Sequence, residues 1–376
     1  MTAVDLPTSN LQQFFTDIDQ CVDKSEVTHG LHPYPAKFIP HIPRQLIREY
    51  APAGATVLDP MCGSGTTLVE ANLLGHPAVG CDLNPIATLA AAAKTTALSR
   101  ADVEVLHELS DQLDAGAHDA LVPDSVPSFL NRDKWFQPHV STELAVARQL
   151  VAGLPSSARL LAMGSLSAII VAVSNQESET RWCAKHNDVP PGTTLRKFAR
   201  KLRRVVEQSA NFNRQATENS LVLRCDSRHL PLATGSVGFV VTSPPYANSH
   251  DYYLYNKLRM FWLGFDVKGV QEAEIGSRNR HSDRRADIDH YLTSMADVLR
   301  ECRRVLMPGS AAAVVVADSV IRGEFFDMGV EFPNIARAAG FEIAERFGFS
   351  HRTHNTTFQS GFGTAVPKRT HVLVFR

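Results

Sequence analysis

A short turn with two glycines is the first stretch of the sequence whose residues could do chemistry. It reads D-P-M-C-G-S-G-T from Asp59 to Thr66, and Asp82 follows at the end of the next apolar run. Glycines at a strand-to-helix turn let a ligand approach the backbone, and an acid ending the second strand can accept both hydroxyls of a ribose. The pattern therefore predicts a nucleoside-containing cofactor.

The same turn indicates which cofactor it would be. A dinucleotide site would carry a third glycine near Leu68 and bind a pyrophosphate, whereas this turn offers only Gly63 and Gly65. A carboxylate at Asp59 would repel phosphate but attract a cationic amino-acid group. S-adenosylmethionine has ribose hydroxyls, an ammonium group and no phosphate, so it is the expected cofactor.

A second stretch, Ser243-Pro244-Pro245-Tyr246, follows an apolar run and could hold a nucleobase. Two consecutive prolines cannot continue a central strand, so they should form a rigid loop with exposed carbonyl groups. The Ser243 hydroxyl and a proline carbonyl can accept both hydrogens of an exocyclic amine, and the Tyr246 ring can stack on a flat heterocycle. This combination suits a base that has been turned out of a duplex.

Both motifs need a scaffold of strands and helices. Apolar runs predict strands at 55–58, 78–81, 220–223, 237–242 and 311–316, and helical periodicity predicts helices at 43–50, 66–74 and 85–97. The segments 341–347 and 371–375 should form a final antiparallel hairpin at the end of the sheet. We therefore expect an α/β fold with a doubly wound, mostly parallel sheet, whose strands present both motifs at their carboxyl ends.

The middle of the chain departs from this alternation and is mostly helical. The sequence predicts an N-terminal segment with the cofactor-binding half of a catalytic domain (1–98), a helical insertion (99–218) and the catalytic half (219–376). Charge is segregated inside the insertion, because residues 101–124 carry only acids and residues 181–214 are strongly basic. Leu195, Phe198, Leu202 and Val205 recur at helical spacing, which predicts an amphipathic helix with a cationic face.

Composition narrows the class of protein. The 376 residues are 44% hydrophobic and 20% charged, which is typical of soluble globular proteins and excludes disorder. The longest apolar stretch, 166–173, is far shorter than the ~20 residues of a membrane span. The six cysteines form no C-x-x-C pair, so we expect reduced thiols, no metal site, and a cytoplasmic protein.

Together the two motifs resemble those of the DNA amino-methyltransferases, which modify cytosine N4 or adenine N6 with S-adenosylmethionine in restriction–modification systems. The resemblance covers about residues 29–97 and 220–376. It implies a seven-stranded, Rossmann-like methyltransferase sheet. Ser-Pro-Pro-Tyr is common in the cytosine-N4 branch, whereas an Asp- or Asn-Pro-Pro-aromatic motif marks the adenine-N6 branch. Unlike many cytosine-N4 enzymes, this chain places the glycine turn before the Ser-Pro-Pro-Tyr loop.

The resemblance also implies a set of site residues. The extended segment with Tyr34, Lys37 and Phe38 should cap the methionine end of the cofactor, and Asp226 with Ser227 should face its adenine. The remaining expected cofactor contacts are Asp59, Pro60, Cys62, Gly63, Ser64, Gly65, Thr66, Asp82 and Leu83, and the expected catalytic residues are Ser243, Pro244, Pro245 and Tyr246. The candidate DNA-binding residues are Arg196, Lys197, Arg200 and Lys201 on the cationic helix, and Arg278, Arg280, Arg284 and Arg285 in a later loop.

The favoured function is methylation of the N4 amine of a flipped-out cytosine in duplex DNA, with a cognate restriction endonuclease as a possible partner. Three alternatives stay open: an adenine-N6 DNA methyltransferase, an RNA or protein amino-methyltransferase, and a degenerate, non-catalytic nucleic-acid-binding partner of a methyltransferase. Both motifs are intact, which argues against the last, since the loss of one would be its signature. The helical insertion, with Trp135, Phe136 and Trp182, is the candidate region for reading the target sequence.

Overall fold

The computed structural model describes residues 11–18, 27–115, 123–247, 251–277, 284–321, 324–349, 357–358, 366–367 and 369–376. Its centre is a seven-stranded sheet with the order β10-β13-β7-β6-β1-β2-β5. The strands are β1 (Val57–Asp59), β2 (Ala78–Asp82), β5 (Ser220–Arg224), β6 (Val237–Thr242), β7 (Leu306–Ala317), β10 (Ile343–Phe349) and β13 (Thr370–Phe375). Strand β13 runs antiparallel to both of its neighbours, and the other pairs are parallel. The predicted α/β fold and the final antiparallel strands are therefore confirmed.

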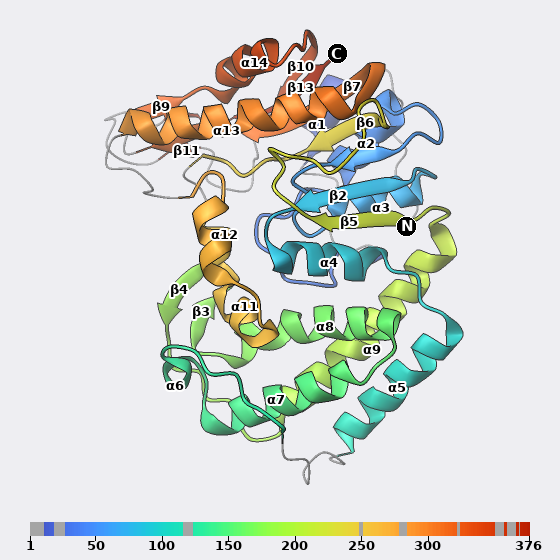
Figure 1. Cartoon of the computed structure of the whole chain (residues 1–376), viewed down its shortest axis with the longest axis vertical. Helices are drawn as coiled ribbons and strands as arrows, with labels where there is room; N and C mark the ends of the chain where they lie inside the picture. Colours follow the sequence, from blue (N-terminus) through green and yellow to red (C-terminus); the bar gives the residue numbers. More distant parts are fainter. Residues whose placement is uncertain are drawn as a thin grey trace.

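Helices cover both faces of this sheet (Figure 1). Helices α1 (Leu11–Thr16), α2 (His41–Tyr50) and α3 (Thr66–Leu73) share one apolar core with Phe239 and Val315 of the strands. Helices α13 (Arg284–Val305) and α14 (Met328–Ala338) share another core with Val240 and Val314. Phe239 and Val240 are neighbours in β6 and therefore point to opposite faces of the sheet, and each lies in an apolar core. Both faces of the sheet are thus apolar, as expected for a sheet buried between two helical layers. Short two-stranded ribbons, β8 (Ser319–Ile321) with β9 (Glu324–Phe326) and β11 (Thr357–Phe358) with β12 (Val366–Pro367), complete this body.

The insertion forms a second, helical body that lies beside α4 (Pro85–Thr95) (Figure 1). Its helices are α5 (Arg100–Asp114), α6 (Arg132–Trp135), α7 (Pro138–Ala152), α8 (Ser156–Ile170) and α9 (Thr193–Gln215). A hairpin of β3 (Gln176–Ser178) and β4 (Arg181–Ala184), which the sequence pattern did not predict, stands between α8 and α9. Among the described helices, residues 156–173 are by length and composition apolar enough to cross a membrane, but 67% of that stretch is buried, as in a core helix of the helical body.

The segregated charges meet in the folded protein. Arg203 of α9 forms ion pairs with Asp111, at 2.9 Å, and with Asp114, both on α5. Helix α5 begins with a capping box in which Ser99 and Asp102 bond each other's backbone N–H groups. The acidic and basic runs are therefore partly complementary surfaces of two packed helices.

An arm of three short helices connects the two bodies. Helices α10 (Tyr252–Tyr255), α11 (Lys257–Leu263) and α12 (Val267–Ala273) follow the Ser-Pro-Pro-Tyr loop, and Figure 1 shows α11 beside α8. Leu258 and Trp262 of α11 belong to the core of the helical body. Arg259, which is fully buried, donates to the Ser167 carbonyl at 3.0 Å and to Glu179 of the hairpin at 2.6 Å. The arm thus ties the helical body and the hairpin to the loop with the second motif.

Candidate active site

One pocket at the carboxyl ends of the parallel strands collects both motifs. Its lining joins the N-terminal extended segment, the glycine turn, the ends of β2 and β5, the Ser-Pro-Pro-Tyr loop and the arm. The lining residues are Tyr34, Ala36, Lys37, Phe38, Asp59, Met61, Cys62, Gly63, Ser64, Thr66, Asp82, Leu83, Asn84, Asp226, Ser227, Ser243, Pro245, Tyr252, Val270, Ala273, Glu274 and Ile275. Most of the residues expected from the sequence therefore lie around one cavity.

The glycine turn is shaped by backbone hydrogen bonds and by close packing. Gly63 (φ 49°) and Gly65 (φ 78°) both adopt left-handed conformations that favour glycine. A Cβ atom at Gly65 would lie 2.7 Å from the Cβ of Ala91, so only glycine lets the turn rest on α4. Gly65 supports the turn from behind, because the pocket wall is formed by its neighbours Gly63, Ser64 and Thr66.

Two carboxylates stand at the ends of the first two strands. Asp82 accepts hydrogen bonds from the N–H groups of Gly63 and Asn84, both at 2.8 Å. Asp59 accepts from the Thr67 hydroxyl at 2.6 Å and from the Met61 N–H at 3.2 Å. Burial raises the pKa of each carboxyl group to about 6, since desolvation penalises the charged form. Both groups are fixed acceptors in the pocket wall at neutral pH.

The N-terminal segment forms a second wall. Tyr34 is buried, and its ring stacks on that of Tyr252 with centroids 6.0 Å apart and an interplanar angle of 10°. Lys37 donates to the carbonyl groups of His29, at 3.2 Å, and His32, at 3.4 Å. Phe38 also lines the pocket. The segment that the resemblance assigns to the methionine end of the cofactor therefore lies against the glycine turn.

The end of β5 closes a further side. Asp226 is held by Arg228, with Nε at 2.9 Å from Oδ1 and a second guanidinium nitrogen at 2.6 Å from Oδ2. Ser227 donates to the carbonyl of Pro60, and this bond ties the end of β5 to the glycine turn. Pro60 is not part of the lining, so its contribution is this carbonyl contact.

The Ser-Pro-Pro-Tyr loop reaches the same cavity through Ser243 and Pro245. The Tyr291 hydroxyl of α13 donates to the Pro245 carbonyl at 2.9 Å, which fixes the loop against the sheet. Tyr246 and Pro244 do not line the cavity; the partly buried ring of Tyr246 packs against the core beneath α13. Burial raises the pKa of the Tyr246 hydroxyl above its usual value.

Several lining residues were missed by the sequence reasoning, and four of them, Val270, Ala273, Glu274 and Ile275, lie on α12 or directly after it. Glu274, which follows α12, accepts from the N–H groups of Tyr252 at 2.9 Å and Tyr253 at 2.7 Å. Burial raises the pKa of the Glu274 carboxyl group to about 8. No local motif marks Val270, Ala273 or Glu274, because they reach the pocket only through the packing of the arm.

The structure describes the side chains of the expected DNA-binding residues only on α9. On α9, Arg196 and Arg200 are exposed, but Lys201 is partly buried and donates to the Gly30 carbonyl at 3.3 Å, and burial lowers its pKa to about 8. Lys197 donates to the Ala172 carbonyl at 3.4 Å. Arg278 and Arg280 lie outside the described residues, and Arg284 with Arg285 begins α13. Helix α9 is thus a packed helix with only part of its basic side in solvent.

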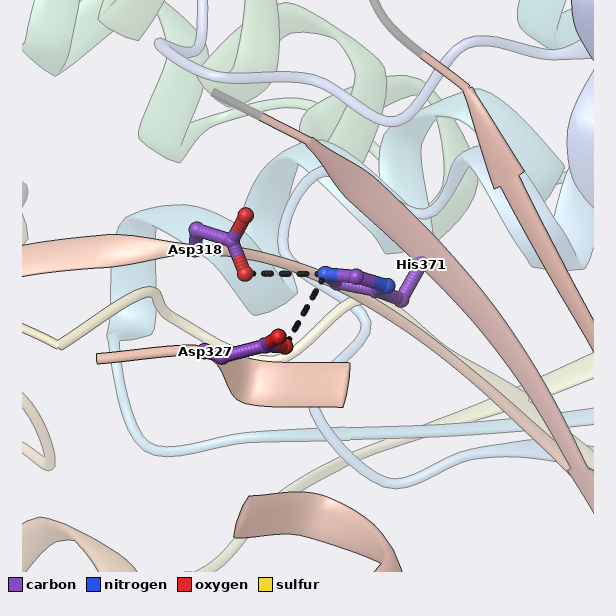
Figure 2. Close-up of side chains that lie close together, drawn as sticks. All are labelled: Asp318, Asp327 and His371. Atoms are coloured by element: carbon purple, nitrogen blue, oxygen red, sulfur yellow. Dashed lines mark hydrogen bonds and ion pairs between the residues drawn. The ribbon is translucent and has the colours of Figure 1, made fainter. Parts of the chain in front are cut away.

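None of the residues that line this pocket belongs to a second cluster, of two acids and a histidine, whose side chains are drawn in Figure 2. Nε2 of His371 lies 2.8 Å from Oδ1 of Asp318 and 3.6 Å from Oδ1 of Asp327. Asp318 also accepts from the N–H groups of Met328 and Arg369, and Asp327 accepts from Gly329 at the start of α14. These bonds join the ends of β7 and β13 to α14, so the cluster has a structural role in the fold.

Comparison with known proteins identifies relatives of the chain. Residues 8–92 match a family model described as DNA methylase. Over 274 residues the chain is 26% identical to the Type II methyltransferase M.MvaI of Kocuria varians, which covers 66% of this chain and 60% of that protein. Over 393 residues it is 20% identical to the Type II methyltransferase M.MjaII of Methanocaldococcus jannaschii, covering 79% of this chain and 73% of that protein.

Solved structures give a more distant likeness. A SAM-dependent methyltransferase from Methanosarcina mazei aligns with 88% of this chain and 95% of its own, at 10% identity and a TM-score of 0.35. The chain spans about three fifths of the length of M.MvaI and about three quarters of the length of M.MjaII.

Proposed function

We propose that the chain is a DNA amino-methyltransferase that transfers a methyl group from S-adenosylmethionine to the N4 amine of a flipped-out cytosine in duplex DNA, and its likeness to a DNA methylase family model and to Type II methyltransferases supports this. The observation that carries this proposal is the meeting of two motifs in one cavity. Asp82 and the glycine turn form one wall, and Ser243 with Pro245 forms another. A cofactor and a base amine could therefore lie next to each other.

The residues present fit the cofactor. Fixed carboxylates at Asp82 and Asp226 are suitable acceptors for ribose hydroxyls and an adenine amine, and Leu68 stands where a dinucleotide site would carry its third glycine. Lys37 adds a positive charge to the lining, on the N-terminal segment that should face an amino-acid moiety. S-adenosylmethionine supplies a methyl group made electrophilic by a sulfonium centre.

The chain contributes alignment and hydrogen bonds. The lone pair of a cytosine amine is delocalised into the ring, so two acceptors for the amine hydrogens would favour a pyramidal nitrogen with its lone pair directed outward. Ser243 lines the pocket as one acceptor, and the Pro244 carbonyl serves as the other if it turns toward the bound base. The bond from Tyr291 to Pro245 holds these acceptors in place before the base arrives. Ser243 has a neutral hydroxyl where adenine-N6 enzymes often have an acid, which supports cytosine as the target.

The target base must leave the duplex, and aromatic rings at the mouth would offset part of the unstacking energy of a few kcal/mol. Tyr252 lines the pocket and already stacks on Tyr34, so it is the better placed ring. Tyr246 is mostly packed against the core in this state, so its stacking role requires that its ring edge faces the incoming base.

We also propose that DNA lies against the β3–β4 hairpin, because β4 contacts α10, the first helix after the Ser-Pro-Pro-Tyr loop. Arg181 and Lys185 are exposed on this hairpin, and Lys257 lies 5.6 Å from the centre of the Trp182 ring. These groups offer positive charge and an aromatic surface beside the expected mouth. A restriction–modification role in the cytoplasm, with a cognate endonuclease, would follow from a Type II assignment.

Expression of the protein in a host lacking cytosine-N4 and adenine-N6 methylation, followed by digestion of plasmid DNA to nucleosides and mass spectrometry, tests this function. We expect N4-methylcytosine in the strain with the wild-type chain and a 10- to 100-fold lower yield with Ser243→Ala, because one amine hydrogen loses a bond of ~1.5–3 kcal/mol. N6-methyladenine without N4-methylcytosine would instead support the adenine-N6 alternative, and methylated RNA with unmodified DNA would support the RNA alternative.

A further inference from the structure

A fully buried lysine stands directly behind the glycine turn. Lys94 is the penultimate residue of α4 and has no exposed surface. Its Nζ donates to the Ser64 hydroxyl at 2.9 Å. Ser64 lines the pocket, whereas Lys94 does not, so the lysine reaches the pocket only through this serine.

The surroundings of Lys94 are cationic. Lys37 and Lys201 are among the charged groups that act on it, and both of these lysines bond backbone carbonyls of the segment before the glycine turn. The ion pairs found in the described part of the chain include none with Lys37, Lys94 or Lys201. Burial without an anion is unfavourable for an ammonium group and lowers the pKa of Lys94 well below its usual value. A ligand with a negative group near Ser64 would remove this imbalance.

Hydrogen-bond chemistry indicates how Ser64 would carry the interaction. A hydroxyl group has one hydrogen to donate and can accept from other donors. Since the Ser64 oxygen accepts from Lys94, its own hydrogen is available for another acceptor, and Ser64 is part of the pocket wall. Among the cofactor's groups, the carboxylate of its methionine moiety is the anionic one.

We propose that Lys94 is a positioning residue for the cofactor's carboxylate: it orients the Ser64 hydroxyl toward the pocket and, with Lys37, supplies the positive charge that makes the site select carboxylate-bearing ligands. This inference rests on the proposed use of S-adenosylmethionine. The simpler alternative is that Lys94 only ties α4 to the glycine turn. If Lys94 positions the carboxylate, its replacement should affect only ligands that carry this group. If Lys94 only ties α4 to the turn, its replacement should affect all ligands of the pocket equally.

Calorimetric titration with two ligands separates them. S-adenosylmethionine carries the carboxylate, and decarboxylated S-adenosylmethionine lacks it but keeps the adenosine, the sulfonium and an amine. We expect Lys94→Met to weaken binding of the first ligand by about 10- to 100-fold, as for the loss of a charge-assisted bond, and to leave binding of the second nearly unchanged. Ser64→Ala should act in the same way, and the double variant should lose less than the product of the two single effects.

Thr95→Val is a matched control, because Thr95 is buried at the next position of α4 and its hydroxyl bonds only the Ala91 carbonyl at 3.0 Å. It should keep the wild-type preference between the two ligands. If Lys94→Met weakens the binding of both ligands equally, the ratio of the two affinities stays as in the wild type. Lys94 would then only hold α4 against the glycine turn, and the proposal would be overturned. If Lys94→Met does not fold, Ser64→Ala decides by the same criterion. A wild-type protein that methylates no base but keeps the ligand preference would overturn the proposed function alone, and one that binds neither ligand would overturn both.

Discussion

At the scale of single residues, the pocket depends on carboxylates whose charge is costly. Asp59 and Asp82 stand where parallel strands end, and desolvation raises the pKa of both to about 6. Each keeps its charge at neutral pH with the help of backbone N–H groups. A cationic ligand with hydroxyl groups would compensate this cost, which is a physical reason for such a site to bind its cofactor tightly.

Asp82→Ala should weaken binding of S-adenosylmethionine by about 10- to 100-fold, because it removes charge-assisted bonds to ribose hydroxyls of ~1.5–3 kcal/mol. Calorimetry on the protein without DNA measures this change. Asp133→Ala is the control, since Asp133 is exposed on α6 in the helical body. An affinity equal to that of the wild type would remove Asp82 from the binding site.

The raised pKa values also predict a pH dependence. Below about pH 6, Asp82 and Asp59 take up protons and lose their charge, so the affinity for the cationic cofactor should be level near pH 7 to 8 and fall between pH 6 and 5. Folding stability should change in the opposite direction. The folded-state pKa lies above the unfolded value, so the folded chain binds more protons between about pH 4 and 6, and this contribution to stability decreases as pH rises through that window. Asp82→Asn should reduce the pH dependence both of the cofactor affinity and of the free energy of unfolding. If neither pH dependence changes, groups other than Asp82 control the titration.

At the scale of elements, the helices of the insertion show why charge along a sequence is a poor guide to a binding surface. Arg203 on α9 is used for ion pairs with α5, and Lys197 and Lys201 bond backbone carbonyls. The hairpin between α8 and α9 has strands of only three and four residues, which are too short for a sequence pattern to predict them. Its place next to α10 comes from tertiary packing.

Replacing Arg181 and Lys185 of the hairpin with Gln should reduce the slope of log affinity against log salt by ~1 to 2 units, because fewer counterions are released from DNA. Fluorescence anisotropy with duplex DNA at several salt concentrations gives the slope. The matched pair Arg196→Gln and Arg200→Gln on α9 tests the original expectation from the sequence. If the α9 pair flattens the slope and the hairpin pair does not, DNA lies along α9.

The cluster in Figure 2 makes a separate prediction about stability. Asp318→Ala would leave the buried N–H group of Met328 and the buried ring of His371 without this acceptor, together with the N–H group of Arg369. We expect the free energy of unfolding to fall by about 2–4 kcal/mol in urea titrations, with little change in affinity for the cofactor. Glu324→Ala, at an exposed position of β9, should be nearly neutral.

The sequence was a good guide wherever one period or one motif determines structure. Strand β6 was predicted over its observed range, and the helices α3 and α4 within two residues, because apolar runs and glycine turns specify them locally. Twelve of the fourteen expected cofactor residues line one pocket, and Pro60 and Gly65 support it from outside. The sequence also indicated Tyr252 or Tyr253 as a ring beside the base, and Tyr252 lines the pocket. Glu274 and Lys94 required the fold, since contacts between distant segments bring them to the site.

At the scale of the whole molecule, α4 is the shared wall between the two bodies. Ala91 of α4 touches Gly65 of the glycine turn, and a Cβ atom at Gly164 of α8 would lie 2.8 Å from the Cβ of Ala93. The core of the helical body also includes Ala93 and Leu31. The cofactor turn and the helical body therefore pack on the same short helix with small residues at both contacts.

Gly164→Ala should destabilise the protein by about 1–2 kcal/mol, because overpacking at this contact exceeds the helix-propensity gain of alanine. It should also weaken cofactor binding, since α4 would shift relative to the glycine turn. Urea unfolding and calorimetry measure the two effects. Gly153→Ala provides the comparison, because its added Cβ would meet only the Leu150 carbonyl at 3.6 Å. Equal behaviour of the two variants would mean that α8 moves aside without affecting the site.

Under the expectation that the helical insertion reads the target sequence, this contact has a consequence for how new target specificities could arise. The chain enters the helical body after α4 and leaves it before β5. Recombination at these two points could therefore exchange the helical body as one unit between related proteins. A transplanted body with a larger residue in place of Gly164 would meet Ala93 and press on the helix that carries Lys94. Productive exchanges should therefore carry α4 together with the new helical body, so that the crossover lies before residue 85.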